Sequence, residues 1–318
     1  MTKGIVMLIH KIARIALLTL ILPYIIVPAA AAAPTLSLAP STQTVPSRQS
    51  FSVNIDLANV TDLFSFEFDL AFDPTLLAAV DITEGPFLPT GGSTFFIPGT
   101  INNTTGTITG TILATADTLI GPLPGVSGSG TLATVRFQAL TQGTSPLTLS
   151  NVFLLDSTLA DIPVSTVPAQ VQVCTPFAAF AVDKLEVEFG PRIDDVFELQ
   201  SRFTLGADSD GIDLVHDPVT LALTGGTTTF VTTIPADSFK QKKRHFRFEG
   251  QLDGVSLEAK LTSLDHNTFT FKVKGEHANL TGFTNPVTLK LIIGNDCGET
   301  PVTIKFERGQ EAKYSSQD

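Results

Sequence analysis

Residues 59–77, NVTDLFSFEFDLAFDPTLL, decide the fold of this protein. Through the middle of this stretch, bulky apolar side chains alternate with small or acidic ones. A period of two predicts a β-strand with one face in a core and the other in water. The strand should end at Asp73-Pro74, because the residue before a proline stays extended and the proline then starts a turn. Its water-facing side is small and acidic, which indicates a flat surface and not a pocket.

Residues 1–33 have the composition of a secretory signal peptide. Lys3, Lys11 and Arg14 precede an apolar run at 15–27, and the small residues at 29–33 supply a cleavage site. A transmembrane anchor is the alternative, although the run is shorter than the roughly 20 residues that span a bilayer. We therefore expect a secreted protein, extracellular or at the cell surface.

Charge is distributed unevenly along the chain. Without the three cations of the leader, the 20 basic and 31 acidic residues leave a net charge of −14, which disfavours nucleic acid and anionic membranes as partners. Residues 34–175 hold ten acids, two arginines and no lysine, whereas residues 176–318 are rich in both signs. This shift predicts a domain boundary near residue 175.

Both parts of the mature chain show strand patterns separated by turn signals, and neither shows a helical period. The fold class is therefore all-β, with two β-sandwich domains at 34–175 and 176–308 and a polar tail at 309–318. The two cysteines, Cys174 and Cys297, predict a disulfide between the domain junction and a late strand, with two free thiols as the alternative.

Three ordered segments resemble cohesin domains, the modules that receive dockerin domains in cellulosome-type assemblies. They are residues 59–77, then 125–140, GVSGSGTLATVRFQAL, and then 146–164, PLTLSNVFLLDSTLADIPV. The resemblance covers roughly 34–173, and it implies a jelly-roll sandwich related in architecture to carbohydrate-binding modules. No family suggests itself for the second sandwich.

The resemblance also implies a partner and a binding face. The partner would be a dockerin-containing protein, and calcium would enter with that partner. The face would be formed by the strands at 63–72, 106–115, 131–140 and 147–155. Carried onto this sequence, the partner-binding candidates are Ser65, Glu67, Asp69, Thr109, Thr111, Leu113 and Arg136. Relatives often carry an asparagine and an aspartate where this chain has Ser65 and Glu67, so the acid is kept and the amide is lost. Solvent-exposed strand positions without a partner are the alternative.

Two segments of the second domain suggest ligands. The loop at 206–217, GADSDGIDLVHD, places Asp208, Asp210, Asp213 and Asp217 around a glycine, as a calcium loop would. Gly206 stands where an EF-hand has an acid, and no helices flank the loop, so acidic turn chemistry is the better interpretation. The run at 240–244, KQKKR, could contact an acidic partner, and a solvated loop is the simpler reading.

The sequence shows no motif for catalysis. The mature histidines, His216, His245, His266 and His277, form no nucleophile motif and no zinc-spaced cluster. The chain has no Trp and only two Tyr, so the usual aromatic platform for sugars is missing as well. The hypothesis is a secreted, non-catalytic binding protein without a cofactor that docks dockerin modules in a polysaccharide-degradation context. The alternatives are an extracellular carbohydrate-binding protein and a structural or adhesive surface protein.

Overall fold

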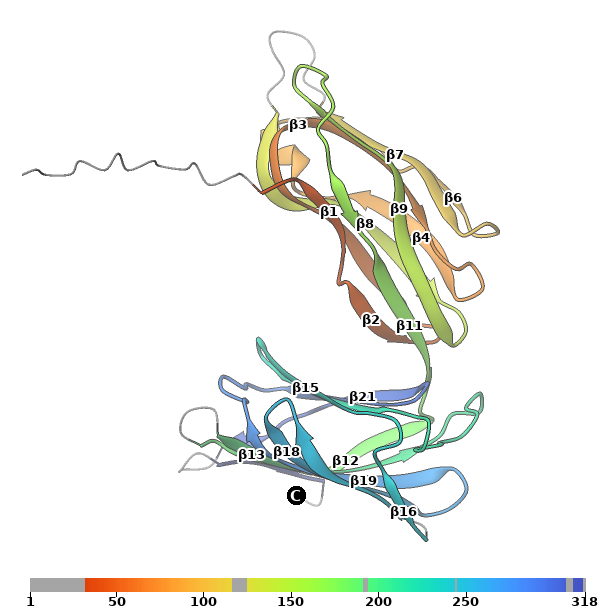
Figure 1. Ribbon diagram of the computed structural model, residues 1–318, viewed down its shortest axis with the longest axis vertical. Helices are drawn as coiled ribbons and strands as arrows, with labels where there is room; N and C mark the ends of the chain where they lie inside the picture. The colour runs from red at the N-terminus through yellow and green to blue at the C-terminus, as the bar shows by residue number, and fades with distance from the viewer. Residues whose placement is uncertain (1–31, 116–124, 191–193, 244, 307–310, 317–318) are drawn as a thin grey trace, which may run out of the picture. The chain divides into compact units, whose positions relative to one another are not determined.

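The computed structural model describes residues 32–115, 125–190, 194–243, 245–306 and 311–316, without the side chains of 113–115 (Figure 1). The expected signal peptide falls almost entirely outside these residues. In the described parts of the chain, no helix is long and apolar enough to cross a membrane. Strands make up almost all of the regular structure, as expected, and one short 3-10 helix, η1 (Leu88–Gly91), interrupts them.

The first sandwich has two sheets that share one long strand, β3 (Ser50–Ala71). The first half of β3 lies in a sheet with β4 (Leu77–Glu84), β8 (Val126–Ala139), β1 (Thr35–Ala39) and β10 (Ser165–Val167). The second half lies in a sheet with β5 (Thr94–Ile97), β6 (Thr100–Asn102), β7 (Thr107–Thr115), β9 (Gly143–Asp156), β11 (Ala169–Pro176) and β2 (Thr42–Pro46).

The crossing of β3 from one sheet to the other occurs at two irregular residues. Asn59 and Asp62 have φ values of 58° and 60°, a left-handed backbone that Asn and Asp adopt more readily than most residues. Their N–H groups are not left unpaired, since each donates to a serine hydroxyl of β8, Ser129 at 3.0 Å and Ser127 at 2.9 Å. The strand can therefore bend without losing backbone hydrogen bonds.

The core of the first sandwich comes from the inward residues of both sheets. Phe66, Phe68 and Leu70 are buried on the second half of β3, as their alternation predicts. Phe137 of β8 stacks on Phe51 with ring centroids 5.6 Å apart. Such burial contributes about 25 cal/mol per Å² of apolar surface, which makes the sheets a rigid support for their outer sides.

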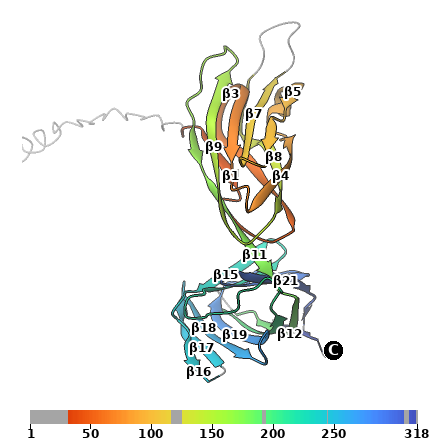
Figure 2. The same cartoon turned by 90° about the vertical axis from the view of Figure 1, so that its right-hand side faces the viewer.

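The second sandwich has its own core between two further sheets (Figure 2). One sheet holds β21 (Asp296–Val302), β20 (Val287–Ile293), β14 (Val219–Gly225) and β15 (Thr228–Ile234). The other runs in the order β16 (Lys240–Lys242), β17 (His245–Leu252), β18 (Val255–Ser263), β19 (Thr268–Ala278), β13 (Asp195–Thr204), β12 (Ala179–Glu188), β23 (Glu311–Ser315) and β22 (Lys305–Phe306).

The expected polar tail at 309–318 is wrong in part. Residues of this segment form β23, in which Lys313 lies opposite Glu186 and Ala312 lies opposite Val187 of β12. Ala312 is fully buried in the second core. The sequence looked like a tail because two apolar positions, Ala312 and Tyr314, among polar residues give only a weak alternation signal.

The two sandwiches are joined through β11, whose end pairs in parallel with β21. The disulfide expected between Cys174 and Cys297 is present there, with an S–S distance of 2.02 Å. Thr175 N and Phe177 N add backbone hydrogen bonds of 2.7 Å to Asn295 O and Cys297 O.

Candidate functional site

The solvent-facing side of β5, β7, residues 63–71 of β3, and β9 is called the outer face below. Phe66 and Phe68 flank Glu67 in the sequence, and both point into the core. Because side chains on a strand alternate in direction, Glu67 and Ser65 lie on the outer face. Both polar residues are half-buried. The structure thus places two of the predicted residues at adjacent outward positions of one strand.

Apolar side chains of the neighbouring strands lie on both sides of Glu67 on the outer face. By register, Glu67 lies opposite Ile112 of β7 and Phe153 of β9, and Ile112 in turn lies opposite Ile97 of β5. Residues directly opposite each other point to the same side of a sheet. The result is one transverse row, Ile97–Ile112–Glu67–Phe153, with a carboxylate between apolar groups.

Three exposed apolar residues on the outer face were not among the predicted ones. Phe95, Ile97 and Phe153 keep 60%, 40% and 56% of their surface exposed, which is unusual for side chains of this size. The run TFFI at 94–97, although bounded by turn residues, is the sequence signal that could have identified two of them. Phe153 was not identified, because the sequence alone did not distinguish the outward from the inward positions of its strand.

Asp69 also lies on the outer face, and its carboxylate is held in place. Gly110 N donates to Oδ1 over 2.8 Å, and Asn151 Nδ2 donates to Oδ2 over 2.7 Å. Gly110 and Asn151 have φ values of 69° and 47°, and both lie at irregularities in the pairing of β3 with its neighbours. The irregular backbone at Gly110 and at Asn151 therefore fixes the orientation of the Asp69 carboxylate.

The predicted positions on β7 are partly wrong. Thr109 is exposed, as predicted. Thr111, however, is fully buried opposite Phe68, and its Oγ1 donates to Pro98 O over 3.2 Å. The bulge at Gly110 inserts one extra residue, so that strict alternation fails and Ile112 takes the outward position. Leu113 pairs with Phe66 along the backbone, and its side chain lies outside the described residues.

Arg136 does not belong to the outer face, which corrects the prediction for β8. It lies opposite Ser52 in the first half of β3 and Asp81 in β4, in the other sheet of the sandwich. Arg136 Nη2 donates to Asp81 Oδ2 over 2.6 Å, and this hydrogen bond holds the pKa of Asp81 below its usual value. The error arose because one strand, β3, serves both sheets.

The four aspartates considered as calcium candidates are engaged in turn and surface contacts, in line with the preferred interpretation as acidic turn residues. Asp208 pairs with Arg48 at 3.4 Å, and Asp213 accepts from its own neighbour His216 at 2.7 Å. Asp210 accepts from Asn295 Nδ2 over 3.1 Å, and Asp217 accepts from Asp213 N over 2.7 Å. In the portion of the chain that the structure describes, no group of three or more His, Cys, Asp or Glu is arranged to hold a metal.

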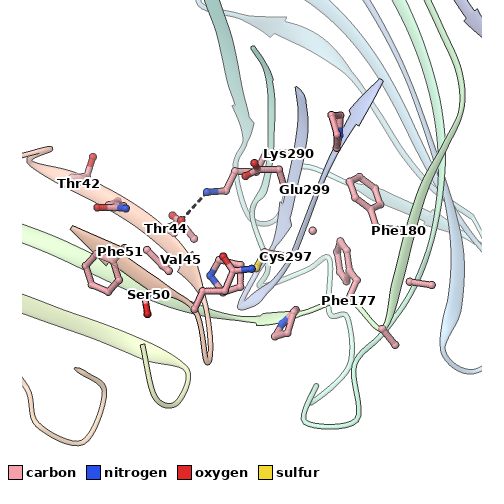
Figure 3. Close-up of a pocket in the computed structure, with 18 residues that line it drawn as sticks. Thr42, Thr44, Val45, Ser50, Phe51, Phe177, Phe180, Lys290, Cys297 and Glu299 are labelled. Carbon is pink, nitrogen blue, oxygen red and sulfur yellow. Dashed lines mark hydrogen bonds between the residues drawn. The ribbon is translucent and has the colours of Figure 1, made fainter. Parts of the chain in front are cut away.

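A cavity of about 750 Å³ lies beside the disulfide, and Figure 3 shows its walls. Phe177 and Phe180 line one side of it. Lys290 Nζ crosses to donate to Thr44 O over 2.7 Å, and burial lowers the pKa of Lys290. This lysine is therefore already used as a structural hydrogen-bond donor.

Comparison with known proteins identifies a family for the first sandwich. The family model of the cohesin domain matches residues 37–173. This part of the chain is a cohesin domain. The second sandwich lies outside the match.

One curated relative of the cohesin domain is cellulose-binding protein A of Clostridium cellulovorans. It is 32% identical over 143 residues, which cover 44% of this chain and 7% of that protein. The chain therefore matches only a small part of the length of this relative.

Solved structures of cohesins are also similar. A non-cellulosomal cohesin from the archaeon Archaeoglobus fulgidus is 19% identical with a TM-score of 0.37, covering 45% of this chain and 93% of that one. The sixth cohesin of scaffoldin B from Acetivibrio cellulolyticus, solved in complex with a Cel5 dockerin mutant, is 17% identical with a TM-score of 0.37. The match covers 45% of this chain and 99% of that one.

Proposed function

We propose that this protein is a secreted, non-catalytic docking protein whose cohesin domain binds a dockerin module through the outer face. The observation that carries the proposal is the row Ile97–Ile112–Glu67–Phe153, which puts exposed apolar groups on both sides of a carboxylate. Protein interfaces depend on a few buried aromatic or charged anchors within a patch of about 800 Å² per partner. The cohesin match supplies the class of partner.

The chemistry of the row suggests what the partner presents. A helix with apolar residues and a Lys or Arg between them would cover Phe153 and Ile97 while pairing with Glu67. Asp69 would already be oriented for such a helix, because Gly110 and Asn151 hold both of its oxygens. Preorganised groups lose less conformational entropy when a partner binds.

Calorimetric titration of the full mature chain with a panel of calcium-loaded dockerins tests the proposal. We expect Phe153→Ala and Glu67→Ala to weaken binding by about 10- to 100-fold, as for interface anchors. Arg136→Ala is the matched control, since Arg136 lies in the opposite sheet, and it should leave the affinity unchanged.

Two results would contradict the proposal. One is a wild-type protein that binds none of the dockerins in calcium. The other is loss of binding in Arg136→Ala without loss in Phe153→Ala. Retention of the wild type on cellulose without any protein partner would instead favour a carbohydrate-binding protein.

A further inference from the structure

The second sandwich carries a straight line of cations across one of its sheets. On the solvent side of strands β16 to β12, successive strands place directly opposite residues in a row: Lys240, Arg247, Lys260, Lys272, Gln200 and Lys184. Five of the six are basic, and the domain as a whole is acidic. This set is called the basic row below; Figures 1 and 2 show these strands.

The charges of the basic row are not explained by folding. Like charges directly opposite each other across a sheet are destabilising, and Arg247, Lys260 and Lys272 form two such pairs in succession. Two members of the row are neutralised, since Arg247 pairs with Glu249 and Glu258, and Lys184 pairs with Glu186 and Glu198. Lys260 and Lys272, at the centre, make no ion pair with any other residue that the structure describes.

Polar groups and a shallow hollow accompany the central lysines. A hollow of about 510 Å³ is lined by four cations, Arg247, Lys260, Lys272 and Lys274, and by two acids, Glu198 and Glu258. The next row of the same face adds Lys242, His245, Thr262, Thr270 and Arg202. Cations and hydroxyls therefore lie side by side over a distance of about 24 Å, from five strand spacings of about 4.8 Å.

From this arrangement we infer that the basic row binds a linear anionic polysaccharide whose carboxylate or sulfate groups contact Lys260 and Lys272. The hydroxyls of Thr262 and Thr270 and the amide of Gln200 provide hydrogen bonds for sugar hydroxyls. This site is separate from the outer face of the cohesin domain. The second sandwich would thus hold the protein on an acidic glycan while the first is free to bind its partner.

Other polyanions fit the surface less well. The two rows contain no Phe, Tyr or Trp at their described outward positions, so they lack the stacking platforms that single-stranded nucleic acids use. The neighbouring row holds four acids, Glu249, Glu258, Glu198 and Glu186, with Lys274 between Glu258 and Glu198. Its carboxylates would repel a densely charged phosphate backbone. An acidic protein surface would find no apolar anchor on this face.

Retention of the mature protein on immobilised polygalacturonate as a function of salt tests the inference. We expect wild-type binding that weakens as salt rises, and a loss of about tenfold or more in Lys260→Gln/Lys272→Gln at low salt. The double variant Lys305→Gln/Lys313→Gln removes the same charge outside the basic row and should bind like the wild type. Lys260→Gln/Lys272→Gln removes like-charge pairs, so it should also raise Tm by about 1–4 °C. A raised Tm would show that the loss of binding does not come from misfolding.

Three outcomes would overturn the inference. The first is a wild-type protein that polygalacturonate does not retain at low salt. The second is equal binding, or equal loss, in the two double variants. The third is retention on single-stranded DNA or polyglutamate to higher salt than on polygalacturonate, which would assign the basic row to another class of polyanion.

Discussion

Asn151 Nδ2 donates a hydrogen bond to Asp69 Oδ2 over 2.7 Å, between two neighbouring strands of the outer face. Asn151 has a left-handed backbone, with φ of 47°, and this conformation places its amide over β3. The contact shows that the acidic surface of the cohesin domain is arranged by its backbone irregularities and not by alternation alone.

If this contact preorganises Asp69, Asn151→Ala should weaken dockerin binding by about 3- to 10-fold even where Asn151 itself makes no contact with the partner. In a double-mutant cycle with Asp69→Ala, the effects on binding should be strongly non-additive, because each change disrupts the same pair. Titration calorimetry on the three variants measures the coupling. Additive losses would show that the two residues act independently.

The bulge at Gly110 predicts opposite roles for two adjacent residues. Thr111→Val alters only a buried side chain, so dockerin affinity should stay within about twofold of wild type, whereas Ile112→Ala should lower it by about tenfold. Chemical denaturation of both variants separates folding from binding. A larger binding loss in Thr111→Val than in Ile112→Ala would place the partner elsewhere.

The disulfide closes a loop with a sequence separation of 123 residues, so its removal should be costly to stability. We expect Cys174→Ala/Cys297→Ala to lower the free energy of unfolding by about 3–5 kcal/mol, since the unfolded chain gains the freedom that the crosslink denied it. Denaturant titration under oxidising conditions measures the difference. Wild type treated with a reductant should approach the double variant, and a difference below about 1 kcal/mol would contradict the expectation.

Asp296 predicts a dependence of stability on pH. Burial raises the pKa of Asp296 to about 6, and the charges of Asp210 and Asp217 add to the rise, while the hydroxyl of Ser209 opposes it. One of its carboxylate oxygens, Oδ1, is buried without a described hydrogen-bond partner.

The folded protein therefore binds a proton at the Asp296 carboxyl more tightly than the unfolded chain does, because aspartates in the unfolded chain have a pKa of about 3.9. Between these two values, stability should fall as pH rises, by up to about 3 kcal/mol from this group. In Asp296→Asn that part of the profile should flatten. Denaturant titrations at pH 4, 5, 6 and 7 compare the two proteins, and parallel profiles would rule out Asp296 as the titrating group.

Sequence alone was sufficient for the fold class and for the inward positions of β3. The inward positions Phe66, Phe68 and Leu70 follow from a period of two, because side chains on a strand point alternately to its two sides. Glu67 and Asp69 followed from the same period. The resemblance of three ordered segments to cohesins was also readable, because these motifs consist of strand and turn residues close together in the chain.

Only the tertiary structure decided which strands share a face and which side chains are reachable. Alternation cannot show that β3 passes from one sheet to the other. Nor can it show that the bulge at Gly110 turns Thr111 inward and Ile112 outward. The pairs Asp69–Asn151 and Lys260–Lys272 join residues of different strands, and register is fixed by pairing across space. The inward positions of β3 were thus encoded locally, whereas both surfaces proposed to bind partners exist only once the sheets have formed.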